Sequence, residues 1–223
     1  MEFCGYKKKL EERVVYKDKM KANLKDLEKI INSDLTTSIK KSEIKFNQLF
    51  IEVNVHDIIS TILFLKTNQK CKFKQLIDIT AVDYPHKDQR FKIVYLLLSH
   101  ENNLRIIINT NIKENESLPS ITKIFSSANW MEREVFDMYG ILFSDHPDLR
   151  RILTDYGFTG HPLRKDFPLT GHTEVRYSEE KKKVVTEPVK LDQEYRDFDF
   201  DSPWEGTKYI DIVKPEKKKP KDQ

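Results

Sequence analysis

Charged residues whose types and spacing could support acid–base chemistry gather in one short stretch: Glu132, Arg133, Glu134 and Asp137. On a helix, Arg133 and Asp137 would lie one turn apart and could pair, with Glu134 on a neighbouring stripe. Two carboxylates at this spacing act as general acid and base only in a pocket that shifts a pKa, and neither a nucleophile nor a cofactor motif accompanies them. The pattern favours an amphipathic helix with solvated charges that ends at Gly140.

Histidine and cysteine, the other residues that could bind a metal, are sparse. His146 and His161 would need further ligands, and His172 is the only other candidate nearby. Because a proline follows each of the first two, we expect these histidines to fix turns or to donate to a carbonyl. Cys4 and Cys71 are too few for an iron–sulfur cluster or a paired zinc site. We expect no metal site.

Glycine is absent from residues 6–139, where the regular elements are expected. Phosphate-binding loops of nucleotide sites need glycines directly after a strand, so that backbone amides can approach the phosphate. The sequence therefore predicts no nucleotide or other cofactor site in this chain.

Apolar periodicity predicts the elements that hold these residues. Helices are expected over residues 17–35, 56–68 and from Ser120 to about 139, and strands over residues 49–55, 76–82, 91–99 and 105–110. Residues 100–103 have the length of a hairpin loop. We predict an α+β fold, a small sandwich of helices on a mainly antiparallel sheet, over residues 1–143, of which 1–16 form an N-terminal extension.

The composition changes near Phe143, after which seven of the nine prolines occur. Poor periodicity over residues 144–206 predicts a long, largely irregular arm, followed by a Lys/Pro-rich tail over 207–223. Its arginines and aromatic residues suit an interface with a partner. Lys+Arg exceed Asp+Glu by only 39 to 36. That balance argues against nucleic-acid binding, although Lys-rich runs at 7–9, 181–183 and 214–221 leave an RNA- or anionic-surface-binding module as an alternative. No apolar run approaches the ~20 residues that a membrane span requires.

The stretch from 132 to 153 resembles the signature of the 30-kilodalton subunit family of proton-pumping NADH:quinone oxidoreductase, respiratory complex I. The signature positions are filled by Glu132, Arg133, Glu134, Asp137, Met138, Tyr139, His146, Arg150, Ile152 and Leu153. Further likeness covers residues 78–85, 153–158, 161–169, 186–189, 195–198 and 202–205. One small departure is His172, where the family more often has an aromatic residue.

The resemblance implies a non-catalytic structural subunit in the quinone module of the peripheral arm, beside the large hydrogenase-like subunit. It implies that FMN, iron–sulfur clusters, NADH and ubiquinone bind other subunits, and that the chain does not form a homo-oligomer. The residues expected at the family signature and partner interface are Glu132, Arg133, Glu134, Asp137, Tyr139, Gly140, His146, Arg150, Arg151, His161, Arg164, Asp166 and Trp204.

Related subunits serve plastoquinone dehydrogenases and membrane-bound hydrogenases, which remain alternatives. Residues 195–206 resemble mitochondrial and alphaproteobacterial members, which favours ubiquinone. The expected location is the matrix side of the mitochondrial inner membrane, in an organelle-encoded copy. The alternative is the cytoplasmic face of a bacterial plasma membrane.

Overall fold

The computed structural model describes residues 24–191 and residue 193. Its contacts divide the chain after Gly171 into two compact units. The sequence composition changes near Phe143, whereas the first compact unit extends to Gly171. Trp204, the predicted extension over 1–16 and the tail over 207–223 lie outside the described residues.

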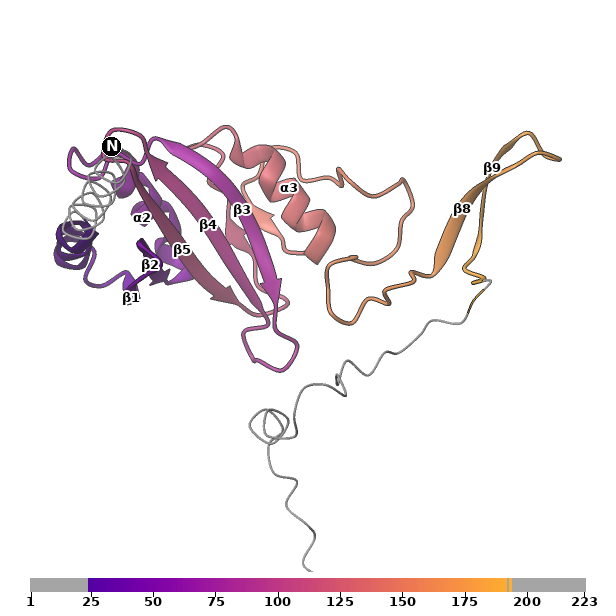
Figure 1. Ribbon diagram of the computed structural model, residues 1–223, viewed down its shortest axis with the longest axis horizontal. Coiled ribbons are helices and arrows are strands. Elements are labelled where there is room, and N and C mark those ends of the chain that lie inside the picture. The colour runs from indigo at the N-terminus through magenta and orange to yellow at the C-terminus, as the bar shows by residue number, and fades with distance from the viewer. Residues whose placement is uncertain (1–23, 192, 194–223) are drawn as a thin grey trace, which may run out of the picture. The chain divides into compact units, whose positions relative to one another are not determined.

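A five-stranded sheet forms the centre of the first unit (Figure 1). Its strands are β1 (Ile39–Lys45), β2 (Gln48–Val53), β3 (Gln75–Asp83), β4 (Phe91–Ser99) and β5 (Leu104–Ile112), in the order β1-β2-β5-β4-β3. Three neighbouring pairs are antiparallel, and β2 runs parallel to β5. The mainly antiparallel sheet is therefore confirmed, as is the hairpin that joins β4 to β5.

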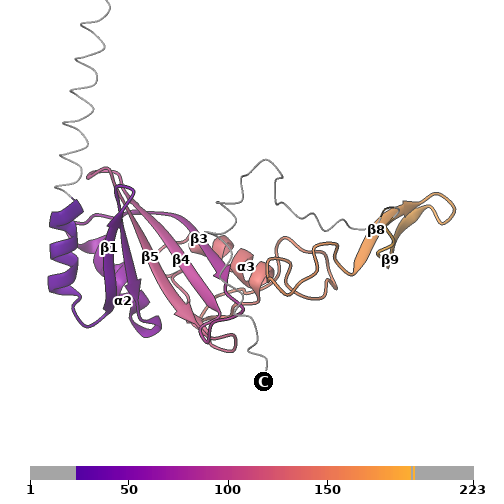
Figure 2. The same ribbon diagram turned by 60° about the horizontal axis from the view of Figure 1, so that its bottom comes forward.

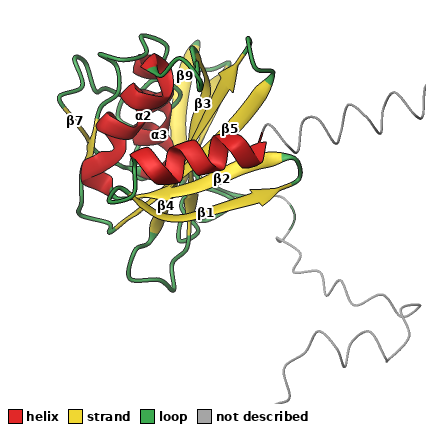
Figure 3. Ribbon diagram, turned by 90° about the vertical axis from the view of Figure 1, so that its left-hand side faces the viewer, coloured by secondary structure: helices red, strands yellow, loops and turns green. Residues whose placement is uncertain are grey.

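Helices cover one face of this sheet (Figure 3). They are a helix over residues 24–34, the 3-10 turn η1 (Val55–Asp57), α2 (Ile58–Thr67) and α3 (Ala128–Tyr139). Alternate residues of β4 are buried, as expected for a strand with one covered face. Apolar side chains of the helices and strands form one core, which gives the predicted α+β architecture.

Two features of the first unit differ from the sequence prediction. Strand β1 was not predicted, because this edge strand carries mostly polar residues without apolar alternation. The third helix begins at Ala128, not at Ser120. Backbone bonds from Ile124 and Phe125 to the carbonyl of Ile121 form turns before the helix, and these turns bury apolar side chains at a similar spacing.

Short strands accompany the sheet. In the first unit, β6 (Leu118–Pro119) pairs in parallel with β7 (Phe143–Ser144). In the second unit, β8 (Thr173–Ser178) and β9 (Lys183–Pro188) form an antiparallel hairpin (Figure 2). Between these short strands, residues 145–172 contain only turns, bends and irregular backbone, as expected for a largely irregular arm. No helix within the described residues is long and apolar enough to cross a bilayer.

Candidate functional site

Several of the signature residues lie at the C-terminal end of α3, whose last four carbonyl oxygens have no partner inside the helix. Each accepts a hydrogen bond: Phe136 O from Gly140 N at 2.8 Å, Asp137 O from His161 Nδ1 at 2.9 Å, Met138 O from Leu163 N at 3.1 Å and Tyr139 O from Arg164 Nε at 2.6 Å. Three of these donors come from residues 161–164, so this end of the helix fixes the segment that follows. Because a carbonyl only accepts, His161 carries its proton on Nδ1.

Gly140 allows this close approach. Its φ of +75° lies in the left-handed region, as predicted for a glycine helix stop. A Cβ at this position would lie 2.5 Å from His161 Nε2 and 2.7 Å from Arg164 Nη2. Any larger residue would therefore push residues 161–164 away from the helix end. Burial also lowers the pKa of His161, which favours the neutral ring.

Asp137, fully buried, accepts hydrogen bonds from the loop that follows the helix. Its Oδ2 accepts from the backbone N–H groups of Ile152, Leu153 and Thr154 at 3.0, 2.7 and 2.9 Å. Its Oδ1 accepts from the Thr154 hydroxyl at 2.6 Å and from Arg151 Nη1 at 3.1 Å. Burial alone would raise the pKa of Asp137, but the Thr154 hydroxyl and the three N–H groups outweigh it and lower the pKa to about 2. The ionised carboxylate thus fixes the loop.

Arg133 does not pair with Asp137 as predicted. Its Nε donates to Arg150 O at 3.0 Å, and its Nη2 donates to Arg151 O at 3.2 Å. The cation that pairs with Asp137 is instead Arg151, because that guanidinium reaches the carboxylate from the loop. Sequence spacing along the helix could not reveal this competition.

Glu132 is also fully buried, against the expectation of solvated charges. Its carboxylate accepts from the Ser120 hydroxyl at 2.7 Å and from the backbone N–H of Ile121 at 2.8 Å. Burial raises the pKa of Glu132 to about 7, although both hydrogen bonds oppose this shift. The side chain therefore connects α3 to the turns that precede it.

His146 lies close to this carboxylate, with 3.8 Å between its Nε2 and Glu132 Oε2. Its Nδ1 accepts from the backbone N–H of Asp148 at 3.1 Å, so Nε2 carries the proton and faces Asn129 O at 3.2 Å. The expectation that this histidine fixes a turn and donates to a carbonyl is confirmed. Within the described residues, no group of three His, Cys, Asp or Glu side chains could hold a metal ion.

A second network ties residues 164–166 to the sheet. Arg90 donates to the buried Asp83 at 2.8 and 3.0 Å and to Asp166 at 2.8 Å. Asp83 also accepts from the backbone N–H of Lys165 at 2.8 Å. Hydrogen bonds from Arg90 hold the pKa of Asp83 below its ordinary value, despite burial. Glu114 accepts from Arg164 at 2.7 Å, which adds a further link. Sequence reasoning missed Asp83, Arg90 and Glu114, since no local pattern marks pairs this far apart.

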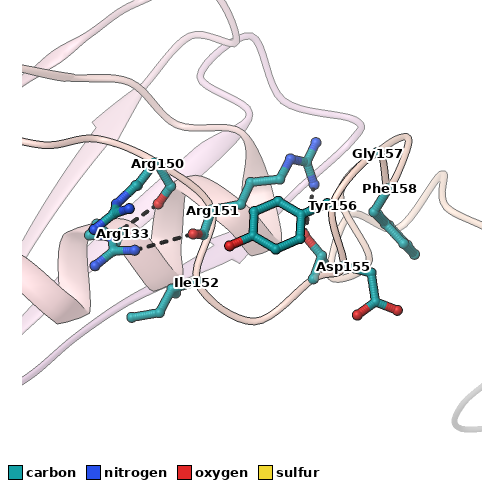
Figure 4. A pocket seen from close by; sticks show the side chains of 9 residues that line it. Arg133, Arg150, Arg151, Ile152, Asp155, Tyr156, Gly157 and Phe158 are labelled. Carbon is teal, nitrogen blue, oxygen red and sulfur yellow. Dashed lines mark hydrogen bonds between the residues drawn. The ribbon is translucent and has the colours of Figure 1, made fainter.

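A surface pocket of about 660 Å³ lies beside α3 (Figure 4). It is lined by Arg133, Arg150, Arg151, Ile152, Thr154, Asp155, Tyr156, Gly157 and Phe158. Arg150 is exposed and pairs with Asp148 at 2.8 Å. Three arginines and one aspartate give the pocket a basic lining. Its position places several of the predicted interface residues on an accessible surface.

A chain of known structure has the same fold. A chain in the structure of the membrane-bound sulfane sulfur reductase, an archaeal respiratory membrane complex, superposes with a TM-score of 0.57 at 24% identity, covering 65% of this chain and 85% of that one. The chain belongs to the family described as respiratory-chain NADH dehydrogenase, 30 Kd subunit, which matches residues 51–173. The resemblance inferred from the sequence is thus confirmed.

Bacterial relatives extend the match over most of the chain. A subunit of the NADH-quinone oxidoreductase of Dinoroseobacter shibae is 57% identical, over 86% of this chain and 89% of that protein. The subunit of the same name from Ruegeria sp. is 54% identical over 84% and 93%, and that from Mesorhizobium japonicum is 49% identical over 86% and 95%.

Proposed function

We propose that this chain is a structural subunit of NADH:quinone oxidoreductase, which supports electron transfer from NADH to quinone and holds no active site of its own. The observation that carries the proposal is the 57% identity to a protein named as a subunit of that enzyme, over most of both chains. The geometry supports a structural role, because Asp137 and Arg164 make internal contacts that fold the segment after α3 against this helix. Glu132 ties the same helix to the turns before it.

The partners in this proposal are the other subunits of the peripheral arm, above all the large hydrogenase-like subunit of the quinone module. FMN, iron–sulfur clusters, NADH and ubiquinone would bind those subunits. The relatives named above are bacterial and do not support the mitochondrial location expected from the sequence. We therefore place the subunit at the cytoplasmic face of a bacterial plasma membrane.

Purification from its own membranes tests this function. A tagged chain should co-purify with the other subunits and with NADH:quinone reductase activity. The same chain expressed alone should be colourless and inactive with NADH and quinone. Recovery of the tagged chain from membranes without that activity would contradict subunit membership. Stoichiometric flavin or iron in the reconstituted isolated chain would contradict the absence of an active site.

A further inference from the structure

In the basic pocket, the guanidinium group of Arg133 has N–H donors that its two hydrogen bonds do not use. Two of the five N–H groups of Arg133 are used by the carbonyls of Arg150 and Arg151, which leaves three (Figure 4). Among the residues that the structure describes, no carboxylate lies within 4.0 Å of Arg133. The other two arginines of the pocket have partners, Asp148 for Arg150 and Asp137 for Arg151. Arg133 is therefore the group in this pocket that still lacks a counter-charge from the described chain.

Arg133 is also held in position. The backbone that carries its carbonyl acceptors leads directly into the loop fixed by the Asp137 carboxylate. A guanidinium group anchored through part of its fork loses less conformational entropy when the remaining donors bind a carboxylate. The site is thus preorganised for a planar anion.

Two exposed aromatic side chains belong to the same helix or the same pocket as Arg133. Trp130 lies three residues before Arg133 on α3, and 68% of it is exposed. Tyr156 lines the pocket and is fully exposed. Tryptophan, tyrosine and arginine are the residues most enriched at the centres of protein interfaces. Their exposure here indicates a binding surface that is covered in the assembled enzyme.

We propose that Arg133, with the exposed Trp130 on the same helix and Tyr156 in the same pocket, binds a carboxylate on an acidic segment of a partner subunit. The inference rests on the proposed function and adds the surface and the chemistry of the partner. A protein carboxylate fits better than a nucleic acid or an anionic lipid surface, because Asp155 lines the same pocket and the exposed Glu134 follows Arg133. Those carboxylates repel a polyanion but tolerate a single paired side chain.

Carbodiimide cross-linking of the purified complex tests the inference. Arg133→Lys places an amine in the pocket, and the reagent joins it to a touching carboxylate as an amide while taking up the lost water as a urea. Mass spectrometry should find position 133 linked to an aspartate or glutamate of another subunit. The matched control is Arg105→Lys, at an exposed position of β5, which should not link to that residue. Links only to Glu134 or Asp155 of the same chain, or no link, would overturn the inference.

Removal of the charge at position 133 provides a second measurement. Arg133→Gln should weaken retention of the chain in the complex by about thirtyfold, judged by native gels over a dilution series, because a desolvated partner charge is left unpaired. Arg105→Gln should be retained like the wild type. Wild-type retention of Arg133→Gln would contradict the inference alone, provided that the wild-type chain co-purifies with the enzyme. Failure of the wild-type chain to co-purify would instead overturn the proposed function.

Discussion

Asp137 shows how one buried charge determines the path of the chain. Its buried carboxylate accepts from three consecutive backbone N–H groups and so holds the loop after α3 in place. Asp137→Asn replaces one acceptor oxygen by a donor and leaves Arg151 without its counter-charge. We expect the free energy of unfolding of the chain to fall by about 3 kcal/mol, measured by urea denaturation at neutral pH. Glu134→Gln, at an exposed position of the same helix, is the control and should change it by less than about 0.5 kcal/mol. Equal stability of both variants would contradict the role of Asp137.

The same carboxylate makes stability depend on acid. Its pKa in the folded chain, about 2, lies below the ordinary value of 3.8, so the ionised form is the one that favours folding. This contribution is fully present above the ordinary value and is lost as the pH falls through about 2.

Glu132 makes the stability of the chain depend on pH in the opposite direction. Its folded pKa of about 7 lies above the ordinary 4.5, so the folded chain binds the proton more tightly, and stability falls as the pH rises between these values. Glu132→Gln stays neutral, can accept from the N–H of Ile121 and can donate to the Ser120 hydroxyl. We expect the variant to match the wild type near pH 5 and to exceed it at pH 8 by on the order of 2 kcal/mol, at ~1.4 kcal/mol per pH unit. Thermal unfolding at both pH values measures this. A variant less stable at pH 8 would show that the ionised carboxylate favours folding.

At the scale of elements, Arg90 connects β3 and β4 to the segment after α3. Its side chain is 13% exposed, and that of Asp83 is fully buried. Arg90→Met should lower the free energy of unfolding by ~3–5 kcal/mol, because it leaves a buried charge unpaired. The double variant Asp83→Leu with Arg90→Met should recover much of the loss, since it removes both charges. Chemical denaturation of the single and double variants checks this.

An exposed pair of the same chemistry supplies the control for Arg90. Arg176 donates to Glu187 at 2.9 and 3.1 Å across the β8–β9 hairpin, and both side chains are substantially exposed. Arg176→Met should cost no more than ~1 kcal/mol. A similar cost at both positions would mean that burial of Asp83 is not what makes Arg90 important.

The sequence predicted the elements whose signal is local. Alternating apolar residues identified β2, and runs of β-forming residues identified β3 and β4. The short loop after β4 pointed to β5, and Gly140 marked the end of α3. The polar edge strand β1 lacked that signal, and the start of α3 was misplaced because the turns after Ser120 imitate helical spacing. At the site, the signature residues were found from the sequence, but their contact partners were not. Asp137 meets residues 14 to 17 positions away, and Asp83 meets Lys165, 82 positions away. Only the folded chain specifies such pairs.

At the scale of the whole molecule, order should change after Gly171. Residues 146–167 are tied to α3 and the sheet, whereas β8 and β9 form a two-stranded hairpin in which Val175, Tyr177 and Val184 are more than half exposed. An isolated hairpin is only marginally stable in water. Hydrogen exchange on the isolated chain should therefore be slow in the helices and strands between residues 24 and 144 and in the tied segment 146–167, and fast in residues 173–188. In the assembled complex the hairpin should become protected, and equal protection in both states would show that it needs no partner.

We infer that the signature around α3 builds and docks a structural subunit and does not perform chemistry. The most direct test is NADH:quinone activity divided by the quantity of intact complex, measured in membranes that carry Arg133→Ala. We expect fewer complexes, because the anchored guanidinium group is lost, while each surviving complex turns over NADH at nearly the wild-type rate. Normal assembly with a collapsed rate per complex would show that this surface takes part in the reaction itself.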